Sequence, residues 1–330
     1  MKRVGSAERV LRQTPVILFL VVLGGFGLLS GSFLSAENLV NIGVQAAPAG
    51  IVAVGMTLVL LTAGVDLSVG AIMFVAAAVA GKMALAGQPF WLVMLTMLGI
   101  GGVFGGVNGF FVTRAGVAPF IVTLALLFVG RGFALWLTQT RAMNLPEVFL
   151  QLGATRVLSV PLPLAGFLGI AVLSQFVLMR TQFGRQIYAV GHNREAARKA
   201  GVESGRILAI VYVVSGVCAA LGAILALGQL GAVTPKFGEN YEFKAISAAV
   251  LGGTSLFGGR GAVLPGTVLG ALLIQSLENG LVLLNADPYL YPLITSAIIF
   301  TAVLLDSVRN ALLARLQRRK IRLEPEFGSS

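Results

Sequence analysis

The chain has 330 residues, of which 57% are hydrophobic and only 11% are charged, and its mean hydropathy is +0.91. Soluble domains carry about 25% charged residues, so this composition excludes an ordinary soluble enzyme or binding domain. The net charge of +11 does not indicate a nucleic-acid partner, because excess Lys and Arg in a membrane protein usually mark its cytosolic loops.

Apolar blocks recur along the chain, and about 20 such residues cross a bilayer core of ~30 Å. They predict an all-α fold, a polytopic transmembrane helix bundle with about ten spans, in a single transmembrane domain over residues 1–330. The first block follows basic residues, as in a signal peptide, but no A-x-A cleavage site follows it, so we interpret it as an uncleaved span. The expected spans are 15–34, 42–63, 69–86, 90–113, 117–138, 161–180, 207–228, 243–258, 262–284 and 288–307.

The basic residues give this bundle an orientation, because short cytosolic loops carry the excess of Lys and Arg. With residues 1–14 in the cytosol, the same side holds Arg114, a central loop over 181–206, Arg260 and a basic tail over 308–330. This arrangement predicts a multi-pass protein in a lipid bilayer with both termini in the cytosol. Six of the 24 Lys and Arg residues belong to the central stretch: Arg180, Arg185, Arg194, Arg198, Lys199 and Arg206.

Some of the many glycines repeat at helical spacing. Gly101, Gly105 and Gly109 stand at i, i+4 and i+8, and Gly266 and Gly270 repeat this spacing once. Small residues on one face let helices approach closely where lipid provides no hydrophobic drive. These glycines are therefore expected to form helix contacts.

Two spans are interrupted by the same pattern, G-x-x-L-x-x-G, at 64–70 and again at 253–259. Irregular backbone at membrane depth persists only where it is buried in protein or lines water, and paired Gly interruptions point to a transport path. The alternative is a pair of tight turns at the cytosolic surface. The pattern alone leaves both interpretations open.

Few polar residues lie within the spans. Asp66 and Ser68 precede a helix, where they would either cap free N–H groups or border a path or gate. Gln275 and Asn279 share a helix face, where amides would bond either a hydroxyl-rich solute or a neighbouring helix. Arg131 would either reach the outer interface or pair with an acid. The residues assigned to a path or gate are Gly64, Asp66, Leu67, Ser68, Gly70, Gln275, Glu278 and Asn279.

No catalytic motif is present. The chain has no G-x-x-x-x-G-K-[ST] to hold ATP phosphates, and one histidine, His192, with one cysteine, Cys218, cannot form the usual zinc sites. We therefore expect no enzyme activity, catalytic site, metal site or bound cofactor in this chain. Transport driven by ATP would need another subunit to hydrolyse it.

The central stretch contains a short charged helix. Residues 193–201 read Asn-Arg-Glu-Ala-Ala-Arg-Lys-Ala-Gly, which favours a helix closed by Gly201 as a C-terminal cap. A short amphipathic helix between spans can dock into the groove of a partner. The alternative is a solvated basic loop beside anionic lipid.

Several motifs resemble those of a known family. Glu195-Ala196-Ala197-x-x-x-Gly201 resembles the E-A-A-x-x-x-G signature of binding-protein-dependent ABC importer permeases. The I-x-L-P half of that signature is missing, since residues 211–214 read VYVV, and this departure fits one branch of the family. TAGVDLSVG at 62–70, GRQIYAVG at 184–191, AAVLGGTS at 248–255 and GGRG at 258–261 resemble the ribose/xylose/galactose-type permeases.

The resemblance implies a fold similar to type II ABC importers, with two permease subunits, identical or different, and a path between them. It implies a bacterial inner-membrane protein that passes a monosaccharide, a pentose or hexose, from a periplasmic sugar-binding protein to the cytosol. A separate ABC ATPase would use the ATP and Mg²⁺. The alternatives are import of a nucleoside, autoinducer or branched-chain amino acid within the same family, or a stand-alone secondary transporter. The implied ATPase-coupling residues are His192, Asn193, Arg194, Glu195, Ala196, Ala197, Arg198, Lys199 and Gly201.

The same resemblance places the binding protein on the outer loops 139–160 and 229–244. Charges at a rim favour orientation over affinity, so specificity for the solute is expected to reside in the binding protein. The charged residues of these loops are Arg141, Glu147, Arg156, Lys236, Glu239, Glu242 and Lys244.

Overall fold

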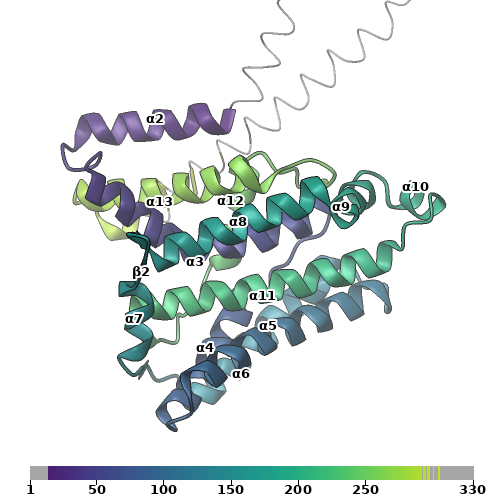
Figure 1. Cartoon of the computed structure of the whole chain (residues 1–330), viewed down its shortest axis with the longest axis horizontal. Helices are drawn as coiled ribbons and strands as arrows, with labels where there is room; N and C mark the ends of the chain where they lie inside the picture. Colours follow the sequence, from purple (N-terminus) through teal and green to yellow (C-terminus); the bar gives the residue numbers. More distant parts are fainter. Residues whose placement is uncertain (1–13, 292, 295, 298–299, 301–303, 305–330) are drawn as a thin grey trace, which may run out of the picture.

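A computed structural model describes residues 14–291, together with 293, 294, 296, 297, 300 and 304. Half of the expected last span, 288–307, and the segments 1–13 and 308–330 lie outside the described residues. The described part is a bundle of helices whose long members run side by side (Figure 1). The predicted all-α, polytopic architecture is confirmed.

The described helices, in chain order, are α2 (Thr14–Leu29), α3 (Ala36–Leu61), α4 (Val69–Leu85), α5 (Phe90–Thr113), α6 (Pro119–Thr138), α7 (Val148–Ala154), α8 (Leu162–Arg180), α9 (Gln182–His192), α10 (Arg194–Lys199), α11 (Ser204–Leu230), α12 (Tyr241–Leu251), η1 (Val263–Thr267), α13 (Val268–Leu283) and η2 (Pro288–Leu290).

Within the described residues, six helices are long and apolar enough to cross a membrane: α3, α5, α6, α8, α11 and the continuous η1–α13 pair. α2 and α4 are shorter apolar helices. The block expected to span at 243–258 differs, because α12 has 11 residues and at 1.5 Å per residue rises only about 16 Å. The prediction of a full span there is wrong, since the chain turns at Gly252 and Gly253, where φ of Gly253 is +91°.

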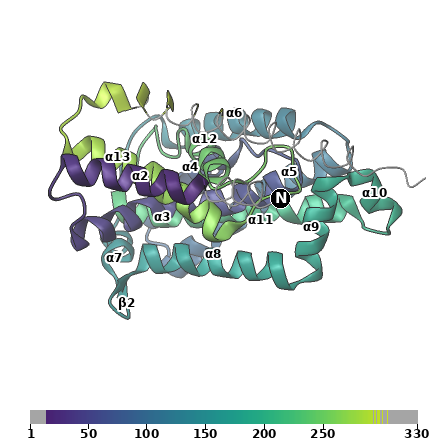
Figure 2. The ribbon, with the colours of Figure 1, turned by 90° about the horizontal axis from the view of Figure 1, so that it is seen from above.

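The bundle has two distinct ends (Figures 1 and 2). α9 and α10 project from one of them, called here the α10 end. α7 and two small antiparallel sheets lie at the opposite end, the α7 end. One sheet pairs β1 (Met143–Asn144) with β4 (Ala232–Val233), and the other pairs β2 (Arg156–Val157) with β3 (Val160–Pro161).

Glycines bring the central helices into backbone contact. Gly101, Gly105 and Gly109 of α5 lie directly against the backbone of α11, which runs antiparallel to α5. Gly266 and Gly270 lie in the same way against the backbone of Gly252 and Ala248, at the C-terminal end of α12. The prediction that these glycines form helix contacts is confirmed.

α3 contains a proline in its interior, Pro48. Proline has no N–H, so the carbonyl of Val44, four residues earlier, loses its helical donor. The side-chain amide of Gln229 in α11 donates to that carbonyl at 2.7 Å. The proline therefore creates a hydrogen bond between α3 and α11 that an unbroken helix would not need.

The close contact of α5 with α11 predicts that replacing glycine by alanine on α5 destabilises the protein only at the contact positions. Gly105→Ala should lower the free energy of unfolding by about 1–3 kcal/mol, because the new Cβ meets the carbonyl of Tyr212. The matched control is Gly106→Ala, whose Cβ meets nothing within 4 Å and which should be neutral or stabilising by up to about 1 kcal/mol. Equal thermal midpoints of the two variants in detergent would contradict the contact.

The Pro48–Gln229 arrangement predicts a coupled pair of substitutions. Gln229→Leu should cost about 1–3 kcal/mol, because the carbonyl of Val44 is left without a donor. In a Pro48→Ala background the same change should cost clearly less, since Ala at 48 supplies the missing helical N–H. A double-mutant cycle of unfolding free energies measures the difference, and equal costs in the two backgrounds would refute the pairing.

Candidate functional site

The segment between α8 and α11 forms a protruding cap at the α10 end (Figure 1). Thr181 lies between α8 and α9, and its side chain accepts the N–H of Gly184 in the first turn of α9. Asn193 separates α9 from α10, and its side chain accepts the N–H of Ala196 at 2.9 Å. This N-cap hydrogen bond stabilises a new helix start, so the chain forms two short helices.

α10 ends at a glycine, as the sequence predicts. Gly201 has a φ of +81°, a conformation that favours glycine. The N–H of Gly201 donates to the carbonyl of Arg198, and the N–H of Val202 donates to that of Ala197. This pair of hydrogen bonds is a Schellman motif, and the prediction of a short helix capped by Gly201 is confirmed.

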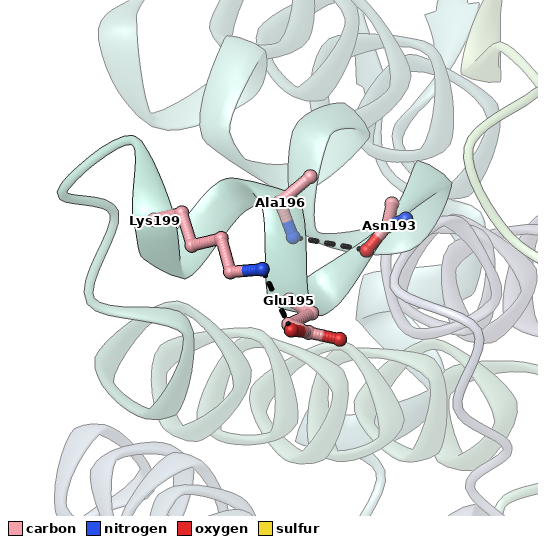
Figure 3. Close-up of polar contacts among 4 residues, drawn as sticks. All are labelled: Asn193, Glu195, Ala196 and Lys199. Atoms are coloured by element: carbon pink, nitrogen blue, oxygen red, sulfur yellow. Dashed lines mark hydrogen bonds and ion pairs between the residues drawn. The ribbon is translucent and has the colours of Figure 1, made fainter.

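Most of the predicted coupling segment faces away from the bundle. Ala197 is buried, with 5% exposure, and anchors α10. Lys199 and Glu195 form an ion pair at 3.0 Å on the exposed surface (Figure 3). Such a pair contributes only about 0–1 kcal/mol, so another molecule could replace it at little cost. The exposed members of the segment are His192, Asn193, Arg194, Glu195, Ala196, Arg198, Lys199 and Gly201.

The inner side of α9 is fixed to two other parts of the bundle. Gly191 lies against the carbonyl of Leu61, the last residue of α3, and Gly259 donates its N–H to the same carbonyl at 2.9 Å. The hydroxyl of Tyr188 donates to the carbonyl of Gly261 at 2.8 Å. Burial raises the pKa of the Tyr188 hydroxyl, which keeps it protonated as a donor.

The α10 end is also the basic end of the described chain. Its only acids among the described surface residues are Glu195 and Glu203, whereas the α7 end mixes acids and bases. The surface therefore has a positive potential, which suits an acidic or polar partner. The basic residues at this end are Arg114, Arg180, Arg185, Arg194, Arg198, Lys199, Arg206 and Arg260.

The first Gly-interrupted loop, between α3 and α4, is buried in the bundle. Asp66 has no exposed surface, and its Oδ1 accepts the N–H and the hydroxyl of Ser68 at 3.0 and 2.6 Å. Ser215 of α11 donates to Oδ2 at 2.8 Å, and Asn108 of α5 donates to the Ser68 hydroxyl at 2.8 Å. Asp66 thus bonds the residue before α4, as a cap would, and also joins that helix start to α5 and α11.

Gly70 brings two helix starts together inside the bundle. It is the second residue of α4, and it lies against Gly238, just before α12, and against the carboxylate of Glu242. Gly64 and Leu67 are buried in the same loop. The N-terminal ends of α4 and α12 therefore meet, and a side chain at position 70 has no room.

The second Gly-interrupted loop, 252–262, lies at the α10 end. Gly258 and Gly259 pack against Gly191 and His192 of α9, and Phe257 is 89% exposed. The two patterns in the sequence thus have different outcomes. The first loop is buried inside the bundle, and the second is a surface turn that contacts α9.

The polar residues of α13 contact α3. Gln275 donates to Oε1 of Gln45 at 2.9 Å, and Asn279 exchanges hydrogen bonds with Asn38 at 2.9 and 3.0 Å. Both residues face the same neighbouring helix, as their spacing predicts.

Two ion pairs lie in the half of the bundle nearer the α7 end. Glu278 of α13 pairs with Lys244 of α12 at 2.6 Å. Arg131 of α6 pairs with Glu239 at 3.8 Å, and its guanidinium lies 5.6 Å from the centre of the Phe74 ring. Of the two alternatives for Arg131, the structure therefore has the pairing with an acid.

The two predicted outer loops, 139–160 and 229–244, are joined at the α7 end by the β1–β4 pairing. One of their charged residues does not fit the expected surface. Glu242 is only 7% exposed, because it packs into the contact between α4 and α12, so its predicted place on the docking surface is wrong. The exposed ones are Arg141, Glu147, Arg156, Lys236 and Glu239.

The sequence analysis did not identify the side chains that bond Asp66, Ser68, Gln275 and the carbonyl of Val44. Gln45, Asn108, Ser215 and Gln229 each stand as polar residues within apolar helices, and none was singled out. Polar side chains in a membrane helix usually face the bundle interior and pair with one another. That isolation was the available signal, but it does not say which helix supplies the partner.

Comparison with known proteins finds relatives over most of the chain. Residues 38–305 match the family described as branched-chain amino acid transport system / permease component. The ribose import permease proteins of Haemophilus influenzae and Escherichia coli are 34% and 36% identical to the chain, covering 90% and 91% of it and 94% and 95% of their own length. The D-allose transport system permease protein of Escherichia coli is 35% identical, covering 87% of the chain and 88% of its own length. No solved structure matches the chain.

The hydrogen bonds of Asp66 predict graded effects of substitution. Asp66→Ala should be strongly destabilising, because it leaves the Ser68 N–H and the Ser215 hydroxyl without acceptors at about 1–3 kcal/mol each. Asp66→Asn keeps one carbonyl oxygen for Ser68 and should cost clearly less. Thermal midpoints in detergent test this order, and equal midpoints for both variants would contradict a bonding role of the carboxylate.

Proposed function

Because this chain belongs to the branched-chain amino acid transport system / permease component family, we propose that it is the transmembrane permease subunit of an ATP-driven ABC importer. In this proposal the solute is a monosaccharide, a pentose or hexose, that a periplasmic binding protein delivers. The observation that carries the proposal is the match of about nine-tenths of the chain to permeases named for ribose import.

The relatives favour a sugar over the other solutes of the family. The family description names branched-chain amino acids, whereas the relatives above are named for ribose and D-allose. A nucleoside, an autoinducer or a branched-chain amino acid remains the alternative, and a stand-alone secondary transporter is a weaker one. Competition of pentoses, hexoses, nucleosides and leucine against labelled ribose uptake separates these solutes.

We place the α10 end in the cytosol of a bacterial inner membrane. The support is the excess of Arg and Lys at that end, because cytosolic loops carry such an excess. Both chain termini are proposed to lie on the same side. The α7 end then faces the periplasm.

The coupling segment 192–201 is proposed to contact a separate ABC ATPase, which holds the ATP and Mg²⁺. Its exposed outer surface and its fixed inner side support this role. Coupling requires that the ATPase bind two permease conformations with different affinities. A segment attached both to the end of α3 and to the loop 252–262 changes its position when those parts move.

The path is proposed to run beside a second permease subunit, as in importers of the type II class. The buried loop with Gly64, Asp66, Leu67, Ser68 and Gly70 is then a hinge or gate, and Gln275, Glu278 and Asn279 of α13 border the path. The exposed charges of the outer loops would receive the binding protein.

The coupling assignment predicts the result of a double substitution. Glu195→Lys with Gly201→Trp should reduce ribose uptake about tenfold or more, equivalent to about 1.4 kcal/mol of lost contact energy. The bundle should remain folded, because both residues are exposed and the strain of a side chain at the Gly201 φ of +81°, about 1–2 kcal/mol, is confined to the end of α10. The ATPase should also no longer co-purify with the permease.

The matched control is Glu203→Lys, which changes an exposed acid at the same end but outside α10. Its uptake should equal that of the unchanged protein. Normal uptake by the double variant, at the same level of folded protein in the membrane, would remove the coupling assignment.

A further inference from the structure

Three polar side chains inside this bundle bond backbone groups at an interruption or start of a helix. Gln229 supplies the donor that Pro48 removes from α3. Asp66 accepts the N–H of Ser68 before α4. Gln175 of α8 accepts the N–H groups at the start of η1, at 2.9 and 3.0 Å. Backbone groups without a partner are costly in a membrane, so a structural reason accounts for each of these residues.

No such reason applies, in the described structure, to a group of polar residues on three neighbouring helices, in which the amide of Gln45 also donates to Asn41 of the same helix at 3.0 Å. Gln45 of α3 bonds Gln275 of α13 at 2.9 Å, and Glu278 of α13 bonds Lys244 of α12 at 2.6 Å. Gln275 and Glu278 are one helical turn apart, so the two pairs are adjacent. Together these four residues form a polar stripe across α3, α13 and α12.

The polar stripe lies on a side of the bundle that the other described helices leave partly exposed. Gln45 is exposed, and Gln275 is half-buried. The side chains of Lys244 and Glu278 are 36% and 25% exposed. On α13 the less buried residues are Leu272, Gln275, Glu278 and Val282, whereas those between them are mostly buried. The stripe is therefore part of an open face.

The polar stripe also lies at the depth of the hydrocarbon core of a bilayer. α3 ends at the α10 end with Leu61, so Gln45, nine residues after Ala36, lies about 14 Å from the α7 end of the helix. Gln275, eight residues before Leu283, lies about 12 Å from the same end of α13. α3 is longer than the ~30 Å hydrocarbon core by only about 9 Å. Both amides therefore lie within the hydrocarbon region.

Contact between this polar stripe and lipid would be energetically unfavourable. An amide or an ion pair turned towards hydrocarbon loses hydration without gaining partners for all its donors and acceptors. The neighbouring spans show what the lipid-facing surface of this chain looks like: Phe128 of α6 and Val172 of α8, each about 15 Å from the α7 end, are 66% and 56% exposed.

We propose that the polar stripe of Gln45, Gln275, Glu278 and Lys244 is the wall of the water-filled path and contacts the passing solute. This inference rests on the proposed function, and it adds Gln45 and Lys244 to the path. It assigns Asn279 to the fixed contact with Asn38 instead. The class of ligand is a neutral, hydroxyl-rich molecule, because the amides and the ion pair offer both donors and acceptors and together carry no net charge.

The sole cysteine, Cys218, is buried, so single introduced thiols can report on water. Labelling rates are measured on the full chain with its ATPase in permeabilised membrane vesicles, in a Cys218→Ala background. Ribose uptake is measured in sealed vesicles that contain the same labelled complex and receive the binding protein. Gln45→Cys and Gln275→Cys are compared with the lipid-facing controls Val172→Cys and Phe128→Cys. The probe is a charged methanethiosulfonate, which reacts with thiolates in water.

The two thiols of the polar stripe should react at least about tenfold faster than both controls, because an apolar environment disfavours the reactive thiolate. Reaction at Gln275→Cys should also abolish ribose uptake, whereas reaction at Val172→Cys should not. Two stripe variants on different helices keep the test valid if one of them fails to fold.

Rates at both stripe positions no faster than at the controls would overturn the inference. Protection of both thiols, together with a spontaneous disulfide that links two copies of the Gln45→Cys variant, would also overturn it, in favour of a dry interface. The labelling rates do not depend on which solute is carried. Failure of the proposed function would instead appear as an absence of sugar uptake by the Cys218→Ala complex, together with fast labelling of the thiols introduced at 45 and 275.

Discussion

A backbone N–H or C=O group inside a bilayer must find its partner within the protein, and the described structure is organised around this constraint. It contains several places where the helical hydrogen-bond pattern is interrupted, and two of them receive a side chain from another helix. The Val44 carbonyl receives Gln229 of α11, and the N–H groups of η1 receive Gln175 of α8. A break that would weaken a helix in isolation therefore becomes a specific link between two helices.

Close contacts of glycine connect these links to the surface of the α10 end. Gly191 of α9 lies against the carbonyl of Leu61, to which Gly259 donates its N–H. The loop that contains Gly259 continues into η1 and α13, and α12 precedes it. At the other end of α12, Gly238 lies against Gly70 of α4. α9 is thus connected to α12 and α4, the two helices that start inside the bundle. The contacts that connect them are between backbone groups and involve no flexible side chain.

The sequence predicted features that depend on composition and local geometry. The apolar blocks located most helices, and the Asn193 to Gly201 segment carried its own cap signals. It did not predict that α12 is half a span, because an apolar run does not reveal where a Gly pair turns the chain. It also placed Glu242 on a surface, because the contact of that residue with Gly70 joins segments that lie far apart in the sequence. Hydrogen bonds such as Asp66 to Ser215 depend on helix packing that single-chain patterns do not contain.

Basic residues are mostly exposed at the α10 end, whereas two of them form ion pairs in the half of the bundle nearer the α7 end. The first arrangement suits a protein partner, and the second suits weak contact with a neutral solute. At the α10 end the arginines outnumber the acids and stay exposed, so a partner there has to bring its own acceptors. In the half nearer the α7 end, Lys244 and Arg131 are paired within the chain, with Glu278 and Glu239. Paired charges offer hydrogen bonds without a net field, so they neither trap nor repel a neutral solute. Weak contacts of that kind suit passage, because a solute that binds tightly in a path leaves it slowly.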